Sequence, residues 1–124
     1  MDYRILVVDD IFVNRLLLRE IVKKFCKNYF EAQNGKEAID ILVREELDVV
    51  LMDIEMPVMN GIETTKYIRE VLTYPKKNVP IIALTAYNPS TFFTDFKNAG
   101  FDQLLSKPYS MESILNCINK VCKK

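Results

Sequence analysis

The chain has 124 residues, 49% of them hydrophobic, which suits one globular domain with a continuous core. Lysine plus arginine and aspartate plus glutamate number 17 each, so the zero formal net charge gives no electrostatic indication of a nucleic-acid or membrane partner. Three cysteines without a CxxC pair indicate neither a disulfide framework nor a zinc site, and the lack of histidine excludes phosphohistidine chemistry within the chain.

Strand-like and helix-like stretches alternate along the chain, beginning with a buried strand at residues 4–8. This early start leaves no signal-peptide pattern, and no apolar run is long enough to span a bilayer. We therefore expect a cytoplasmic domain with reduced cysteines and no membrane contact. A helix is predicted at about residues 14–25, where Leu17, Ile21, Val22 and Phe25 have helical spacing, and a second strand at residues 29–32.

Asparagine residues mark the starts of the next two helices. Asn34 precedes Glu37 by three residues, which is the spacing of a capping box, and Asn60 with Glu63 repeats it before a helix that reaches about residue 72. Between these helices, a buried strand at residues 48–52 leads directly to Asp53. The two cap signals therefore frame the third strand and the acid that follows it.

The second half of the chain continues the alternation. A polar loop at residues 73–79 precedes a fourth strand at residues 80–84, and Asn88 with Pro89 predicts the start of a fourth helix. Gly100 is expected to end that helix in a left-handed turn. A fifth strand at residues 101–106 leads to a last helix, capped by Ser110. The apolar positions of this helix are Met111, Ile114, Leu115, Ile118, Val121 and Cys122.

Five strand–helix units of this kind predict an α/β fold: a doubly wound, five-stranded parallel sheet with five helices on its two faces. The crossovers should be right-handed, and we expect residues 1–124 to form a single domain. In sheets of this class, ligands bind beyond the carboxyl ends of the strands. The residues that follow each predicted strand are therefore the candidate site.

Acids, a hydroxyl and an amine follow four of the five strands. Asp9 and Asp10 come after the first strand, Asp53 after the third, Thr85 after the fourth and Lys107 after the fifth. Carboxylates gathered in one cleft repel one another, and a hard cation such as Mg²⁺ relieves that repulsion. A carboxylate is also a nucleophile toward phosphoryl groups, and phosphoryl transfer depends mainly on positioning and charge neutralisation. The set therefore points to phosphoryl chemistry.

Four segments resemble the receiver domain of two-component response regulators, and the resemblance covers the whole chain. They are VVDD at residues 7–10, LMDIEMPVMNG at 51–61, IALTA at 82–86 and LSKP at 105–108. The sequence of residues 53–61, together with Asn14, is similar to that of receivers in hybrid sensor histidine kinases. The resemblance implies a flavodoxin-like sheet of order 2-1-3-4-5, as in chemotaxis regulators. It also implies a signalling module that catalyses only its own phosphorylation and dephosphorylation. Such a module is not a turnover enzyme in the usual sense.

The resemblance also implies roles for single residues. Asp53 corresponds to the phosphoacceptor and to one metal ligand. Asp10 corresponds to a direct ligand of Mg²⁺ or Mn²⁺, and Asp9 to a second acid that acts on the metal directly or through water. The backbone carbonyl of Glu55 corresponds to the remaining protein ligand. The backbone at Glu55 is also expected to bind the phosphoryl group.

Residues after the fourth and fifth strands are expected to contact the phosphoryl group. Thr85 corresponds to the switch hydroxyl, Ala86 to a small residue that admits the group, and Lys107 to the lysine that pairs with its oxygens. The Lys107–Pro108 peptide bond is expected to be cis.

The chain departs from the usual receiver pattern at Leu104, where the family often has Tyr or Phe three residues before the lysine. The usual aromatic switch is therefore in question, although a leucine can still change rotamer. Glu55 and Tyr87 occupy positions that tune the access of water to the phosphoryl group. Phe93 falls beside the apolar stripe of the fourth predicted helix, and we hypothesise that it belongs to a partner surface.

The expected phosphodonor is a histidine kinase or a histidine phosphotransfer domain, on a separate chain or domain. A phosphorylation-dependent homodimer is a further expectation, and direct nucleic-acid binding is not. Two alternatives remain open. One is a receiver that acts only by docking to a partner. The other is a haloacid-dehalogenase-type phosphatase, because Asp53-Ile54-Glu55 faintly resembles the DxD nucleophile motif of that family. The chain could be a complete regulator, but the sequence of the motif favours a fragment of a hybrid kinase.

Overall fold

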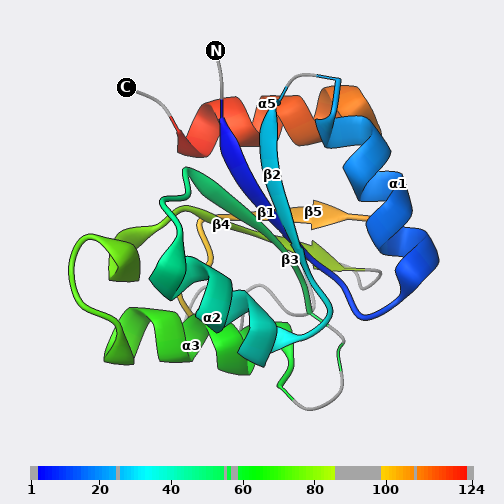
Figure 1. Cartoon of the computed structure of the whole chain (residues 1–124). Helices are drawn as coiled ribbons and strands as arrows, with labels where there is room; N and C mark the ends of the chain where they lie inside the picture. The colour runs from blue at the N-terminus through cyan, green and yellow to red at the C-terminus, as the bar shows by residue number, and fades with distance from the viewer. Residues whose placement is uncertain are drawn as a thin grey trace.

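Five strands form one parallel sheet in the order β2-β1-β3-β4-β5 (Figure 1). The computed structural model describes residues 3–24, 26–54, 56, 59–85, 99–107 and 109–122. The strands are β1 (Arg4–Val8), β2 (Asn28–Ala32), β3 (Val49–Asp53), β4 (Ile81–Thr85) and β5 (Gln103–Ser106). The predicted sheet class and strand order are confirmed, with strand bounds shifted by no more than two residues.

Four α-helices connect or follow these strands within the described residues. They are α1 (Phe12–Val22), α2 (Gly35–Arg44), α3 (Gly61–Val71) and α5 (Met111–Val121), and a 3-10 helix, η1 (Lys76–Asn78), occupies the predicted polar loop. The helix predicted from Asn88 lies outside the described residues. Gly100 has a φ of 105°, the left-handed conformation predicted for it. None of the helices in the described ranges combines the length and apolar composition that a bilayer crossing requires.

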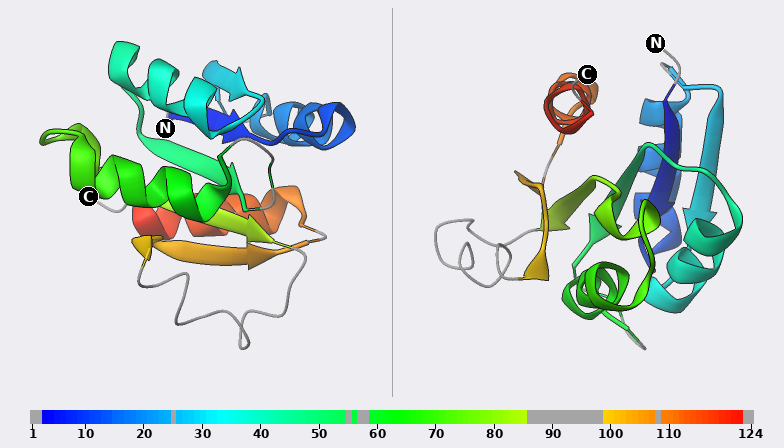
Figure 2. Two further views of the ribbon diagram at one scale, coloured as in Figure 1. Left: turned by 90° about the horizontal axis from the view of Figure 1, so that it is seen from below. Right: turned by 90° about the vertical axis from the view of Figure 1, so that its left-hand side faces the viewer.

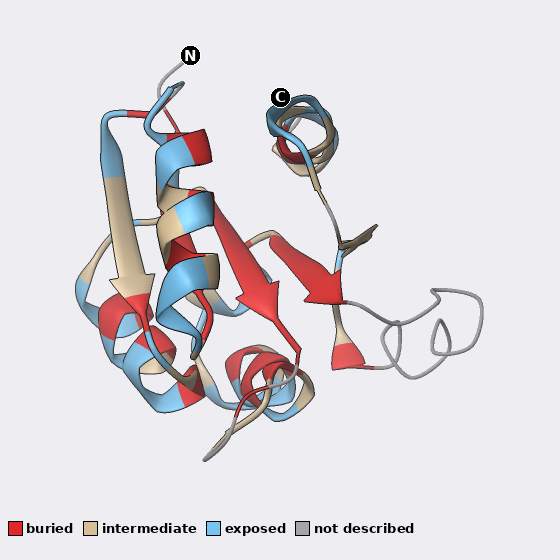
Figure 3. Cartoon of the chain, turned by 90° about the vertical axis from the view of Figure 1, so that its right-hand side faces the viewer, coloured by how far each residue is buried: buried red, intermediate tan, exposed pale blue. Residues whose placement is uncertain are grey.

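The sheet separates two apolar layers because successive side chains of a strand point to opposite faces. Ile5 and Val7 pack with residues of α1 and α5, whereas Leu6 and Val8 pack with residues of α2 and α3. Helices therefore cover both faces (Figure 2). The central strands β3 and β4 are buried throughout, and the edge strand β2 is mostly half-buried (Figure 3). This burial agrees with strands that lie between two helix layers.

Side-chain caps fix where three helices begin. The Asn34 side chain accepts a hydrogen bond from the Glu37 amide at 2.9 Å. The Asn60 side chain accepts one from the Glu63 amide at 2.8 Å, and the Glu63 carboxylate accepts the Asn60 amide at 3.0 Å. Ser110 caps α5. The predicted starts of α2, α3 and α5 are confirmed, because these caps satisfy amides that have no partner inside the helix.

Two apolar positions that helped to predict helices are exposed. Leu17 in α1 is 51% exposed, whereas Leu18 is fully buried. The apolar residues on the inward face of α1 are Leu18, Ile21 and Val22, which have the i, i+3, i+4 spacing of one helix face, and Leu17 lies outside it. Met111, in the first turn of α5, is 42% exposed, whereas Ile114 and Ile118 of the same helix are fully buried in the core.

Gly61 allows α3 to begin directly against the end of β3. A Cβ atom on Gly61 would lie 2.5 Å from the Asp53 carbonyl oxygen and 2.8 Å from the Ile54 Cα. The Gly61 amide donates to the Ile54 carbonyl at 2.9 Å. The glycine therefore permits the close packing that holds the backbone on which Asp53 stands.

Candidate functional site

Three carboxylates meet at the carboxyl ends of β1 and β3. Asp9 and Asp10 follow β1, and Asp53 is the last residue of β3. One carboxylate oxygen from each lies within 4.8 Å of the others. Asp9 is completely buried and Asp53 is 2% exposed. The structure therefore brings together the three acids that the sequence placed at neighbouring strand ends.

Lys107 reaches this cluster from the far side of β4. Its Nζ donates to Asp53 Oδ1 at 3.1 Å, while its backbone amide donates to the Thr85 carbonyl at 2.7 Å. Thr85 ends β4, is fully buried and pairs with Ser106 of β5. Because β4 lies between β3 and β5, Thr85 and Lys107 stand on one side of Asp53 and the other two acids on the opposite side.

Burial opposes ionisation at the centre of the cluster. Desolvation, followed by the charge of Asp9, raises the pKa of Asp53 to about 6, although Lys107 partly opposes this shift. Desolvation also raises the pKa of Asp9 above its ordinary value, against a hydrogen bond from the Ile11 amide. One lysine does not balance three carboxylates held this close together, so the cluster lacks positive charge.

The acids fit a hard divalent cation. Asp9 Oδ2 and Asp10 Oδ1 are buried, and neither has a hydrogen-bond partner among the described residues. Buried oxygens of this kind are costly unless a donor or an ion satisfies them. Mg²⁺ and Mn²⁺ prefer carboxylate oxygens, so Asp9, Asp10 and Asp53 are suitable ligands for either ion.

Other predicted site residues are only partly described. Leu104 is half-buried and packs against Ile54 and Ala83. The predictions that fall outside the described residues concern Glu55, Ala86, Tyr87, Phe93 and Pro108.

Two residues near the site were missed by the sequence analysis. Arg15 donates from Nη1 to the Asp9 carbonyl at 2.9 Å, and it shares the inward face of α1 with Leu18 and Val22. A cation at a core position of that helix was the available signal. The second residue is Tyr109. Desolvation, followed by the charges of Asp9 and Asp53, raises the pKa of Tyr109, which keeps its hydroxyl protonated beside the acids. Its sequence position gave no comparable signal.

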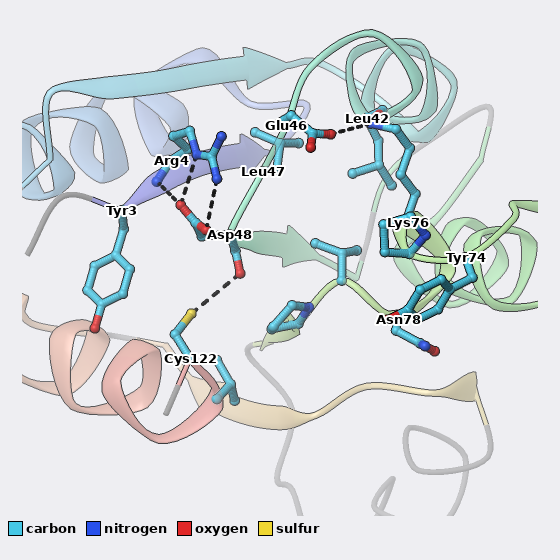
Figure 4. A pocket seen from close by; sticks show the side chains of 14 residues that line it. Tyr3, Arg4, Leu42, Glu46, Leu47, Asp48, Tyr74, Lys76, Asn78 and Cys122 are labelled. Carbon is cyan, nitrogen blue, oxygen red and sulfur yellow. Dashed lines mark hydrogen bonds and ion pairs between the residues drawn. The ribbon is translucent and has the colours of Figure 1, made fainter. Parts of the chain in front are cut away.

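A hollow of about 600 Å³ lies at the opposite end of the sheet, near the amino ends of β1, β3 and β4 (Figure 4). Its charged groups are engaged within the chain. Arg4 pairs with Asp48 at 3.1 Å, and Lys76 donates to the carbonyls of Leu42 and Glu45. The hollow is remote from the acid cluster and shares no residue with it, so we place the candidate site at the carboxyl ends.

A family model described as the response regulator receiver domain matches residues 5–119. Sporulation initiation phosphotransferase F of Bacillus subtilis is 33% identical, over 97% of this chain and 94% of its own length. The aerobic respiration control sensor protein ArcB of Escherichia coli is also 33% identical, over 94% of this chain but only 15% of its own length.

Solved structures show the same similarity. The receiver domain of the sensor histidine kinase PA1611 from Pseudomonas aeruginosa, crystallised with a magnesium ion in its active site cleft, has a TM-score of 0.88 and 26% identity, covering 100% of both chains. The receiver domain of Ssk1 from Saccharomyces cerevisiae, in complex with the histidine phosphotransfer protein Ypd1, has a TM-score of 0.85 and 29% identity. It covers 97% of this chain and 88% of that one.

Proposed function

The chain belongs to the response regulator receiver domain family of two-component phosphorelay signalling, and from this we propose that Asp53 is its phosphoacceptor. One observation carries the proposal. Asp53 is a buried carboxylate that accepts a hydrogen bond from Lys107 and lies beside Asp9 and Asp10, within 4.8 Å. A nucleophilic carboxylate flanked by a cation and by a metal-ligand set has the groups that phosphoryl transfer requires.

We assign the ligands of Mg²⁺ or Mn²⁺ to Asp9, Asp10 and Asp53, with the backbone carbonyl of Glu55 as a further ligand predicted from the sequence. The buried, unpartnered oxygens of Asp9 and Asp10 support this assignment, as does the magnesium ion in the similar PA1611 receiver. When bound, the ion supplies the positive charge that neutralises the acids and the incoming phosphoryl oxygens.

In the proposed reaction, a carboxylate oxygen of Asp53 attacks the phosphorus of a phosphohistidine. The new O–P bond forms as the N–P bond breaks, and the imidazole nitrogen leaves with the electron pair and takes up a proton. Lys107 Nζ, already 3.1 Å from Asp53 Oδ1, then pairs with the phosphoryl oxygens. Water later attacks the phosphorus, the O–P bond to Asp53 breaks, and inorganic phosphate leaves as the Asp53 carboxylate is regenerated.

The remaining roles extend this proposal. Thr85 supplies a hydroxyl to the phosphoryl group, Ala86 leaves space for it, and Leu104 repacks in the switch. Glu55 and Tyr87 tune the access of water. The space that Ala86 leaves for the phosphoryl group and the cis form of the Lys107–Pro108 bond are predictions from the sequence. Leu104 is placed to respond because it packs against Ile54, the residue after Asp53.

The donor we propose is a histidine kinase or a histidine phosphotransfer protein, in agreement with the similarity to the Ssk1 receiver seen in complex with Ypd1. A homodimer that forms on phosphorylation and a cytoplasmic location remain predictions. The chain spans 94% of the length of one curated relative and 15% of the length of another. The receiver role proposed here therefore concerns this domain, and no output is assigned to a longer protein.

Intact-mass spectrometry after incubation with acetyl phosphate tests the proposal. We expect one added phosphoryl group in the presence of Mg²⁺ and none with excess chelator. Asp53→Asn should remove the adduct, whereas Asp40→Asn, an exposed acid of α2, should retain it. A beryllofluoride binding control covers the case of rapid hydrolysis.

Two results would contradict the proposal. An adduct that persists in Asp53→Asn would place the phosphoacceptor elsewhere. No adduct and no beryllofluoride binding would favour a domain that only docks. Multiple turnover of a small phosphoester would instead support a phosphatase.

A further inference from the structure

Arg15 is buried at a position where a charged side chain is unusual. Its exposed fraction is 9%, and it is the one buried cation among the residues that the structure describes. Arginine is seldom buried unless its guanidinium is paired and hydrogen-bonded. The contacts that compensate for this burial therefore indicate what the residue does.

The guanidinium of Arg15 joins the backbone behind the acid cluster to the end of β2. Nη1 donates to the Asp9 carbonyl at 2.9 Å, and Nε lies 3.4 Å from Glu31 Oε1. The guanidinium also lies over the ring of Phe12, 5.6 Å from its centroid. Three directions of contact leave the planar group little freedom to rotate, which suits a side chain that holds another residue in place.

Three hydrogen bonds hold Asp9 in place, and Arg15 donates one of them. The Asp9 amide donates to the Ala32 carbonyl at 3.1 Å, and its Oδ1 accepts the Ile11 amide at 2.9 Å. Arg15 fixes the carbonyl, which leaves the buried Oδ2 without a partner among the described residues. The backbone of Asp9 is thereby fixed while one of its carboxylate oxygens remains available.

We propose that Arg15 is a positioning residue for the divalent cation: by fixing the Asp9 backbone against Glu31, it presets the Asp9 carboxylate for metal binding. This inference rests on the proposed metal-dependent function. It concerns a residue that, in this structure, contacts neither Asp53 nor the oxygens of Asp9 and Asp10 that lack hydrogen-bond partners. Residues that orient metal ligands in this way commonly change metal affinity about 10-fold or more when they are replaced.

Arg19 provides a matched control on the same helix. Its Nη1 lies 3.5 Å from Glu31 Oε2, so it shares the acidic partner of Arg15. Among the described residues its guanidinium pairs with Glu20 and Glu31 and not with Asp9. Replacement of Arg19 therefore perturbs the same ion-pair cluster and leaves the bond to the Asp9 carbonyl intact.

Electron paramagnetic resonance of free Mn²⁺, with Mg²⁺ as competitor, measures metal affinity directly. We expect Arg15→Met to weaken Mn²⁺ binding about 10-fold. Arg15→Lys should weaken it about 3-fold, because an ammonium group cannot bond the Asp9 carbonyl and Glu31 with the same fork. Arg19→Met should stay within about 2-fold of wild type. Circular dichroism establishes that each variant is folded.

Phosphorylation by acetyl phosphate gives a second readout that a purely structural role would not produce. In Arg15→Lys the Mg²⁺ concentration for half-maximal rate should rise, while the rate at saturating Mg²⁺ approaches that of wild type. Arg15→Lys decides the question alone if Arg15→Met does not fold.

Wild-type affinity in the folded Arg15 variants overturns the inference, as does equal weakening in Arg19→Met. Asp10→Asn separates this failure from failure of the proposed function. If wild type binds Mn²⁺ and Asp10→Asn does not, the metal site stands and only the role of Arg15 falls. If wild type binds no metal, the proposed function itself is in error.

Discussion

At the scale of single residues, Asp53 stands in a place that disfavours its own charge. It is 2% exposed, lies beside Asp9 and Asp10, and has Lys107 as its paired cation among the described residues. The raised pKa, about 6 against an ordinary 3.8, expresses this conflict. The arrangement favours binding of a cation over stability of the empty site, because a metal ion removes the repulsion that the fold maintains.

The conflict predicts that Asp53→Asn stabilises the metal-free domain near neutral pH. Because the folded pKa lies above the unfolded one, the carboxyl's contribution to stability is full below about pH 4 and is lost as pH rises through about 6. At pH 7.5 the variant should therefore be more stable than wild type, by up to about 3 kcal/mol. Urea unfolding in excess chelator at pH 4 and pH 7.5 measures the difference.

At pH 4 the same two proteins should be nearly equal in stability, because Asp53 is then protonated in wild type. Asp40→Asn, which changes an exposed acid, controls for the loss of one formal charge. A gain for Asp53→Asn that is equally large at pH 4 would show that repulsion between charges is not its cause.

The acids and the lysine could be predicted because each follows a strand, and parallel strands deliver their carboxyl ends to one edge. Arg15 and Tyr109 could not be predicted in this way. Their roles depend on which way a helix face and a loop side chain point. Arg15 lies on the inward face of α1, and strand-end reasoning does not reach a residue inside a helix.

At the scale of elements, α1 exposes apolar side chains beside the acid cluster. Ile11 and Leu17 are each 51% exposed, Phe12 is 60% exposed and Val13 is 68% exposed. We call these four residues the α1 patch. Ile11, Phe12 and Val13 follow Asp10 directly along the chain, and Leu17 lies one helical turn after Val13. Exposed apolar clusters often mark protein interaction sites. If Asp53 is the phosphoacceptor, as we propose, we expect the protein that phosphorylates it to contact this patch.

The patch predicts that Val13→Ser slows transfer from a phosphohistidine protein and leaves phosphorylation by acetyl phosphate unchanged. Loss of one exposed valine from an interface should reduce the rate constant at subsaturating donor about 5-fold, on the order of 1 kcal/mol. Rapid-quench measurement with the histidine phosphotransfer or kinase protein that transfers fastest to wild type gives the rate.

Val43→Ser is the matched control, since Val43 lies on α2 and is 56% exposed. An equal loss in both variants would assign the effect to general destabilisation. A loss with acetyl phosphate as well as with the protein donor would place Val13 in the chemistry instead of in docking.

The same element marks where sequence reasoning about helices succeeded and failed. Cap residues predicted the starts of α2, α3 and α5, because a side chain that accepts an amide acts locally. The α1 N-cap, Ile11, makes no side-chain cap bond, so the helix begins at Phe12 without a local signal. The helix predicted from about residue 14 has an apolar stripe that includes the exposed Leu17 and omits its buried neighbour Leu18.

At the scale of the whole molecule, the site exists only in the folded chain. Asp9 and Lys107 are far apart in sequence, and β1, β3, β4 and β5 must take their places in the sheet before their ends meet. A cation that binds this cluster therefore binds the native state in preference to the unfolded chain. Metal binding and folding are linked for this reason, and stability reports on the assembly of the site.

This linkage predicts that Mg²⁺ raises the thermal midpoint of the wild-type domain. At a free concentration 100 times the dissociation constant, the gain is about 2.7 kcal/mol, or roughly 10 °C for a domain of this size. The gain should be larger at pH 7.5 than at pH 5, because Asp53 must lose its proton to bind the metal and its pKa is about 6. Differential scanning calorimetry with Mg²⁺, against NaCl of equal ionic strength, measures the shift.

Asp10→Asn should lose most of the shift, and Asp40→Asn should keep it. A shift that survives in Asp10→Asn, or that NaCl reproduces, would mean that the ion acts through general screening and not at the acid cluster.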